Sequence, residues 1–134
     1  MAQEYRRKTT SVSLVNYHFV WCPKYRRQVL AGLIQERLGA LIRDMLAELN
    51  CQVLALEAMP DHVHLFVNAP PTLSPCQIVF LLKGRSARVL RQEFPPLRRL
   101  PSLWTRSYFV ATAGNVSADT IRHYIEMQKQ RERA

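Results

Sequence analysis

The chain lacks the features that mark several other classes of protein. Its three cysteines, Cys22, Cys51 and Cys76, are far apart and form no Cys-x-x-Cys pair, so neither a zinc ribbon nor a thioredoxin-like site is expected. No apolar run approaches the roughly 20 residues that a membrane helix needs. The polar, basic N-terminus also lacks the apolar core of a signal peptide. We therefore expect a protein of the reducing cytoplasm.

Acidic residues are scarce as well. The chain has 10 Asp and Glu against 19 Lys and Arg, which gives a formal net charge of +9. A domain this basic is expected to bind a polyanion, most commonly nucleic acid, although charge can also serve solubility alone. Clustered basic residues, two of the groups with neighbouring aromatics, are our predicted DNA contacts: Arg6, Arg7, Lys8, Lys24, Arg26, Arg27, Lys83, Arg85 and Arg88.

The pattern of apolar residues predicts one α+β domain over residues 1–134. We expect a flexible basic arm (1–10), strands at 11–22, 51–58, 62–68 and 103–113, and helices at 29–49 and 74–94. A proline-bracketed loop (95–102) precedes the last strand, and a glycine joint at Gly114 leads to a final helix (116–131). The first six elements follow the ferredoxin-like β-α-β-β-α-β order, an antiparallel sheet with two helices on one face.

His62 and His64 are the first candidate site residues. On a strand, residues i and i+2 point to the same face, so both imidazoles would lie side by side and could share a metal ion. Two exposed strand histidines are the plain alternative. Asp61 is a possible extra carboxylate ligand, although forming the turn before the strand is its more ordinary role.

Tyr124 and Gln128 are the second candidate pair. They are four residues apart on the expected final helix and so share a face. Packing in an amphipathic helix would explain Tyr124 alone, but an amide in an apolar stripe needs a partner. Gln128 and phosphate oxygens could complete a metal site begun by the histidines, and Tyr124 could attack phosphorus. Neither His18 nor His123 has a companion at ligand spacing, and we interpret both as structural or DNA-contacting.

Five stretches resemble the single-tyrosine HUH transposases, the TnpA type of small insertion sequences that move as single-stranded DNA. They are YHFVWCPKYRRQVL (17–30), MPDHVHLFVNAPP (59–71), LLKGRSARVL (81–90), LWTRSYFVATAG (103–114) and YIEMQ (124–128). They occur in the expected order and span nearly the whole chain. The pairing of His-hydrophobic-His with a late Tyr-x-x-x-Gln is specific as a set.

The resemblance implies a transposase that cleaves and rejoins single-stranded DNA through a 5′-phosphotyrosine intermediate. It implies Tyr124 as the nucleophile and His62, His64 and Gln128 as ligands of Mg²⁺ or Mn²⁺, with no nucleotide cofactor. The implied partners are DNA hairpins at the element ends and a second copy of the chain, with Tyr124 acting in trans. The implied location is the bacterial or archaeal cytoplasm, at the nucleoid while the protein acts.

Three alternatives stay open. A domesticated, repeat-associated relative would share the same chemistry. A non-catalytic single-stranded nucleic-acid binder on a ferredoxin-like frame would bind without cleaving, although KGRSARVL (83–90) lacks the aromatics of an RNA-recognition motif. A metal-dependent hydrolase would use water in place of Tyr124 and would leave no covalent adduct.

Overall fold

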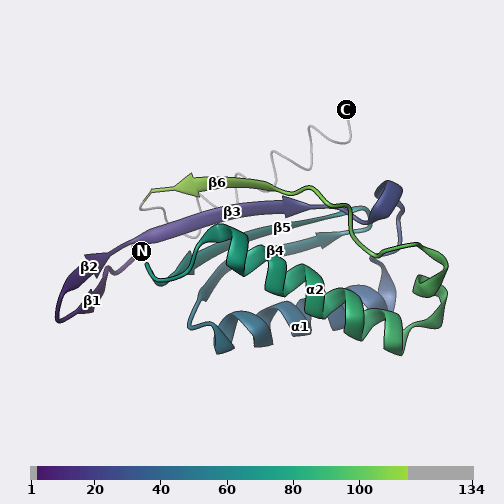
Figure 1. Ribbon diagram of the computed structural model, residues 1–134, viewed down its shortest axis with the longest axis horizontal. Helices are drawn as coiled ribbons and strands as arrows, with labels where there is room; N and C mark the ends of the chain where they lie inside the picture. Colours follow the sequence, from purple (N-terminus) through teal and green to yellow (C-terminus); the bar gives the residue numbers. More distant parts are fainter. Residues whose placement is uncertain (1–2, 115–134) are drawn as a thin grey trace.

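The computed structural model describes residues 3–114. A four-stranded antiparallel sheet in the order β4-β5-β3-β6 forms one layer. Its strands are β3 (Val15–Trp21), β4 (Gln52–Met59), β5 (His62–Ala69) and β6 (Phe109–Ala113). Helices α1 (Gly32–Glu48) and α2 (Pro75–Glu93) cover one face of this sheet (Figure 1). This topology confirms the predicted ferredoxin-like frame.

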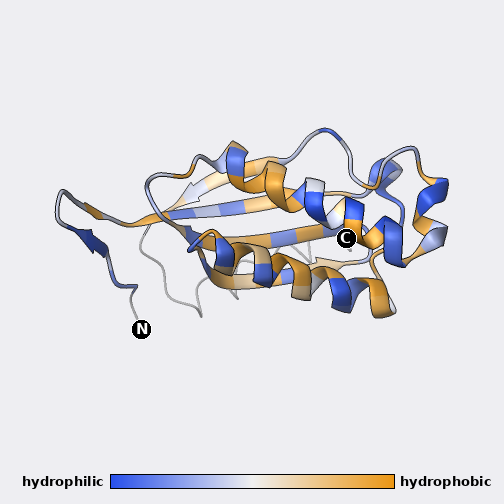
Figure 2. Ribbon diagram, turned by 60° about the horizontal axis from the view of Figure 1, so that its bottom comes forward, coloured by the Kyte–Doolittle hydropathy of each residue, from blue (hydrophilic) through white to orange (hydrophobic). Residues whose placement is uncertain are grey.

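The core lies between the sheet and the two helices. Strand β5 is buried along its whole length and alternates its side chains between the two faces. Val63, Leu65 and Val67 pack into the core with the buried sides of α1 and α2. In Figure 2 both helices carry apolar and polar stretches in alternation, as expected of helices with one buried side. The even-numbered residues of β5 therefore face away from the helices.

Local signals explain where the helices begin and end. Ser74 caps α2, because its Oγ accepts a hydrogen bond from the Gln77 backbone N–H while the Gln77 side chain accepts one from the Ser74 N–H. Asn50 lies just past α1 with φ +59°, the left-handed conformation that asparagine tolerates. The backbone N–H groups of Asn50 and Cys51 donate to Ala47 and Leu46, as in a Schellman motif.

The N-terminal segment differs from the expected arm followed by one long strand. Strands β1 (Arg6–Lys8) and β2 (Ser11–Ser13) pair as a separate two-stranded sheet, which extends beyond the end of the main sheet (Figure 1). The predicted strand at 11–22 is thus divided into β2 and β3. Part of the predicted arm therefore has regular structure, and its flexibility stays a prediction.

The predicted strand at 103–113 is wrong in its first half, because regular pairing with β3 begins only at Phe109. Trp104 instead turns into the core, where its Nε1 donates to Ser86 Oγ at 3.0 Å. Pro23, two residues after the end of β3, forms an isolated bridge with Trp104 and has no N–H to continue the ladder.

The remaining boundaries shift by a few residues. Short 3₁₀ helices occur at η1 (Lys24–Arg26) and at η2 (Pro95–Arg99), the latter inside the predicted proline-bracketed loop. No helix within residues 3–114 is both long and apolar enough to cross a membrane. The predicted final helix (116–131), with Tyr124, Gln128 and His123, lies outside the described residues.

Candidate metal centre

His62 and His64 lie side by side on β5, on the face of the sheet away from the helices. Both side chains are buried, and their ring centroids are 4.7 Å apart with the planes at 90°. Imidazole nitrogens are common metal ligands, and two neighbouring rings on one strand face can each direct a nitrogen toward the same ion. The pair therefore fits a shared metal ion, and the alternative of two exposed strand histidines is wrong.

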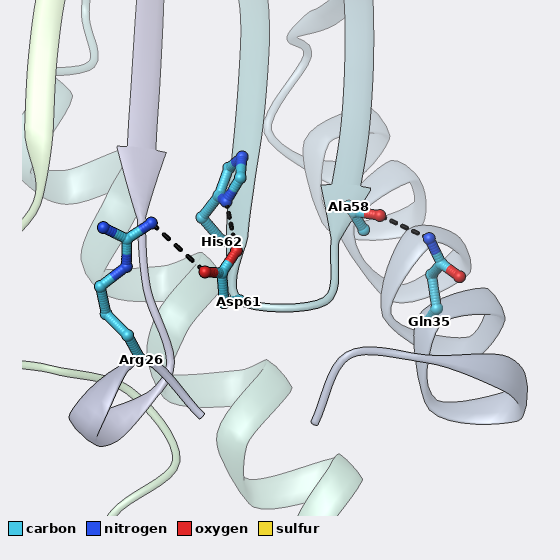
Figure 3. Close-up of polar contacts among 5 residues, drawn as sticks. All are labelled: Arg26, Gln35, Ala58, Asp61 and His62. Carbon is cyan, nitrogen blue, oxygen red and sulfur yellow. Dashed lines mark hydrogen bonds and ion pairs between the residues drawn. The ribbon is translucent and has the colours of Figure 1, made fainter. Parts of the chain in front are cut away.

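Asp61 contacts both the Nδ1 atom of His62 and the side chain of Arg26. Its Oδ1 lies 2.7 Å from His62 Nδ1, and its Oδ2 lies 3.4 Å from an Arg26 guanidinium nitrogen (Figure 3). Both Asp61 oxygens are engaged in this way, so the structure shows Asp61 as a partner of the His62 ring, and its role as an extra ligand stays a prediction. A carboxylate on the outer nitrogen of a metal-binding histidine is a common second layer of such sites.

Other contacts fix the turn between β4 and β5, from which His62 emerges. The Gln35 side chain donates to the Ala58 carbonyl, which ties α1 to the end of β4 (Figure 3). The backbone N–H of Leu30 donates to the Pro60 carbonyl at 3.0 Å. These contacts connect the turn to the segment that precedes α1.

His64 is in contact with another histidine. The Nε2 atom of His18 lies 3.3 Å from His64 Nδ1, and both side chains are buried. Burial lowers the pKa of His18 to about 4, so this imidazole is neutral at physiological pH. The sequence interpretation of His18 as structural or DNA-contacting did not include this contact, which depends on the register of β3 against β5.

The two histidines do not form a complete metal site by themselves. Glu57 of β4 is the register partner of His64 and is therefore a carboxylate on the neighbouring strand. Even so, within residues 3–114 no group of three or more His, Cys, Asp or Glu side chains is arranged to hold a metal ion. Gln128, the third predicted ligand, lies outside the described residues, as does Tyr124.

The predicted DNA-contacting residues fall into two sets. Some are engaged within the protein: Arg6 bonds to Asn68, Lys24 lies over the Tyr25 ring, Arg26 pairs with Asp61, Lys83 donates to the carbonyls of Thr105 and Ser107, and Arg85 pairs with Glu48. Burial also lowers the pKa of Lys83. The others are exposed, and their side chains have no hydrogen-bond or ion-pair partner among residues 3–114: Arg7, Lys8, Arg27 and Arg88.

An apolar hollow of about 470 Å³ lies between α2 and the segment before β6. Phe80, Gly84, Ala87 and Tyr108 are among its lining residues, with Lys83 among the basic ones. It is lined by α2 and residues 102–108, whereas His62 and His64 lie on the opposite face of the sheet. This hollow is thus separate from the histidine pair.

Known proteins resemble the chain in both sequence and fold. The family model described as "Transposase IS200 like" matches residues 11–128. The ISDra2 transposase TnpA of Deinococcus radiodurans is 38% identical over 121 residues, which cover 88% of this chain and 86% of that protein. The transposase for insertion sequence element IS200 of Salmonella typhimurium is 34% identical over 122 residues, 87% of this chain and 80% of that protein.

Two solved structures share the fold. A candidate transposase from Deinococcus radiodurans R1 superposes with a TM-score of 0.76 at 36% identity, covering 92% of this chain and 97% of that one. A REP-associated tyrosine transposase bound to a REP hairpin superposes with a TM-score of 0.55 at 18% identity, covering 91% of this chain and 67% of that one. With the family model matching most of its length, the chain belongs to the IS200-like transposase family.

Proposed function

We propose that this transposase cleaves and rejoins single-stranded DNA at the ends of an insertion sequence through a covalent link to Tyr124. His62, His64 and Gln128 would hold Mg²⁺ or Mn²⁺. The observation that carries the proposal is the pair of buried imidazoles on one sheet face, whose centroids are 4.7 Å apart. Buried histidines arranged in this way are expected of a metal site more than of a packed core.

The proposed reaction exchanges one phosphodiester bond for another. The Tyr124 oxygen attacks phosphorus, the bond from phosphorus to the 3′ oxygen breaks, and the proton lost by the phenol is balanced by the one that the 3′-hydroxyl gains. The 5′ end is left on Tyr124, and attack by a 3′-hydroxyl reverses the exchange. No nucleotide cofactor is needed, because the bond energy is conserved in the phosphotyrosine.

Each residue has a separate task in this scheme. A divalent cation held by the histidines would act as a Lewis acid on the scissile phosphate and would favour the phenolate of Tyr124, whose ordinary pKa is about 10. His62 and His64 bind through one ring nitrogen each. Asp61 keeps the His62 ring in place through Nδ1. Gln128 supplies an amide oxygen.

The proposed partners are single-stranded DNA with hairpins and a second copy of the chain. The structural neighbour bound to a REP hairpin has a related fold and provides a precedent for a hairpin ligand. A formal net charge of +9 favours a polyanion, and the exposed, unpaired basic residues are the proposed phosphate contacts. In the proposed homodimer, Tyr124 of one subunit completes the site of the other.

A denaturing gel tests this proposal. Labelled single-stranded DNA from the flanks of the element is incubated with protein and either Mg²⁺ or EDTA. We expect a covalent band with Mg²⁺, none with EDTA, and none with Tyr124→Phe. Tyr5→Phe is the matched control, since Tyr5 is an exposed tyrosine far from His62 in sequence. It should form the adduct at the wild-type rate.

Other results would favour the alternatives. Metal-dependent cleavage without an adduct would make water the nucleophile and the protein a hydrolase. Tight binding without cleavage, over a range of substrates and metals, would indicate a non-catalytic single-stranded nucleic-acid binder. Adduct formation on repetitive chromosomal hairpins, but not on element ends, would indicate a domesticated relative.

A further inference from the structure

A metal-binding imidazole has to be held at one ring nitrogen while the other binds the metal. The nitrogen away from the metal must carry the proton, and a hydrogen-bond acceptor there fixes both the tautomer and the ring plane. Asp61 is the acceptor for His62. His64 needs an equivalent partner at its Nδ1. Glu57 of β4 is the register partner of His64, and a second candidate comes from β3.

His18 occupies that position. Its Nε2 atom lies 3.3 Å from His64 Nδ1, and the two ring planes are within 16° of parallel with centroids 5.6 Å apart. The contact crosses from β3 to β5 diagonally, because the register partner of His18 is Phe66 and that of His64 is Val20. A neutral imidazole can accept at Nε2 when its own proton is on Nδ1.

Aromatic neighbours hold the His18 ring in turn. It stacks on Phe66 with centroids 4.2 Å apart and planes at 2°, and it meets Phe109 of β6 edge-on at 5.6 Å. His18 is only 4% exposed. The ring thus has little freedom to turn its Nε2 away from His64.

We propose that His18 is a positioning residue, which accepts a hydrogen bond from His64 Nδ1 and so directs His64 Nε2 toward the metal. The inference rests on the proposed metal site formed by His62 and His64. The reverse arrangement, with His18 donating, would place the His64 proton on Nε2 and prevent it from binding a metal. The two ligands are then oriented by chemically different partners, a carboxylate for His62 and a neutral imidazole for His64.

Two substitutions of His18 distinguish its proposed role as a hydrogen-bond acceptor from a role in packing against Phe66. His18→Phe retains a flat ring to stack on Phe66 but has no acceptor, whereas His18→Gln loses the ring but places an amide oxygen near the former Nε2. Binding of Mn²⁺ to the protein without DNA is measured by the loss of the free-ion paramagnetic resonance signal. We expect His18→Phe to weaken Mn²⁺ binding by about 10- to 100-fold, and His18→Gln to recover much of that loss.

A packing role would give the opposite order, with His18→Phe binding Mn²⁺ like the wild type and His18→Gln binding it poorly, and this would overturn the inference. His64→Ala shows whether the metal site itself exists. If His64→Ala leaves Mn²⁺ binding unchanged, the proposed function loses its metal site, which is a different failure from an unchanged His18→Phe.

A spectroscopic test does not depend on either variant folding. Nitrogen-15 correlation spectra of histidine-labelled wild-type protein at neutral pH, without metal, distinguish the two neutral tautomers. We expect the proton of His64 on Nδ1 and that of His18 also on Nδ1. A His64 proton on Nε2 would overturn the inference.

Discussion

The Nδ1 atoms of His62 and His64 each lie within hydrogen-bonding distance of a second side chain, at 2.7 Å and 3.3 Å. Removing either imidazole should therefore remove a proposed ligand and also leave its partner, Asp61 or His18, without that contact. For His62→Ala we expect Mn²⁺ binding and strand cleavage to fall together, by at least about 10- to 100-fold.

Two controls accompany His62→Ala. Binding of labelled hairpin DNA, measured by fluorescence anisotropy in EDTA, should be close to that of the wild type, because the predicted phosphate contacts are elsewhere. The thermal midpoint should show a folded protein. Full cleavage activity in the variant would contradict the metal role of His62.

For individual residues, the sequence predicted that His62 and His64 lie together, but it did not predict their contacts with Asp61 and His18. Alternation along a strand is sufficient to place His62 and His64 on one face, and the structure confirms that placement. The contact of His18 with His64 requires the pairing of β3 with β5, and a slip of one residue would move His18 to the other face. The Asp61 contact requires the exact path of the turn, which residue types alone do not define.

Among the secondary-structure elements, α2 has the clearest local signal. Its capping box joins Ser74 and Gln77 through reciprocal hydrogen bonds of 3.1 Å and 2.8 Å. Ser74→Ala should lower the free energy of unfolding by about 1 kcal/mol, because a backbone N–H at the helix start loses its acceptor. Urea denaturation followed by circular dichroism measures the change.

Thr72→Ala is the control for the cap, since Thr72 is an exposed hydroxyl residue two positions before Ser74. It should leave the urea midpoint close to that of the wild type. Equal midpoints for Ser74→Ala and the wild type would mean that the capping box adds nothing to stability.

The order of the helices and strands could be predicted because each has its own periodicity of apolar residues. The extent of the last strand could not be predicted in this way. Residues 103–108 have the β-branched and aromatic composition of a strand, yet Leu103 and Trp104 are buried in the core. Tertiary packing, together with Pro23 just after the end of β3, decides where β6 begins. The split between β2 and β3 at Leu14 likewise follows from pairing with different partners.

For the whole molecule, we expect surface charge and the proposed dimer to determine how DNA is held. The β1–β2 hairpin extends beyond the main sheet (Figure 1). It carries Arg7 and Lys8, which are exposed and whose side chains have no hydrogen-bond or ion-pair partner among residues 3–114. The double variant Arg7→Gln, Lys8→Gln should weaken binding of single-stranded DNA. It should also reduce the slope of log K against log salt by about 0.7 for each lost phosphate contact.

Arg85→Gln is the comparison for the double variant. Arg85 is also exposed, but it pairs with Glu48 at 2.8 Å, so it should contribute less to the slope. Binding is measured by anisotropy over a series of salt concentrations. An unchanged slope in the double variant would remove the hairpin from the DNA-binding surface.

The proposed trans arrangement is a property of the proposed dimer and can be tested by mixing variants. Tyr124→Phe keeps the histidines, and His62→Ala keeps the nucleophile, so neither should form an adduct alone. In a mixed dimer, the tyrosine of the His62→Ala subunit would complete the site of the other subunit. We expect adduct formation to return on mixing, carried by the His62→Ala subunit.

A size tag on one variant identifies which subunit carries the DNA. If tagged and untagged subunits exchange, as shown by co-purification, and no adduct forms, then the tyrosine acts in cis. An adduct on the Tyr124→Phe subunit would indicate a different nucleophile.

The central claim is a covalent bond between DNA and Tyr124 in a metal-dependent site. The most direct measurement is mass spectrometry of the trapped adduct. Wild-type protein is incubated with single-stranded DNA and Mn²⁺, then digested with nuclease and protease, and the modified peptide is sequenced. The account predicts a nucleotide attached through its 5′ phosphate to Tyr124, present with Mn²⁺ and absent with EDTA. Attachment to another residue, or efficient cleavage with no modified peptide, would contradict it.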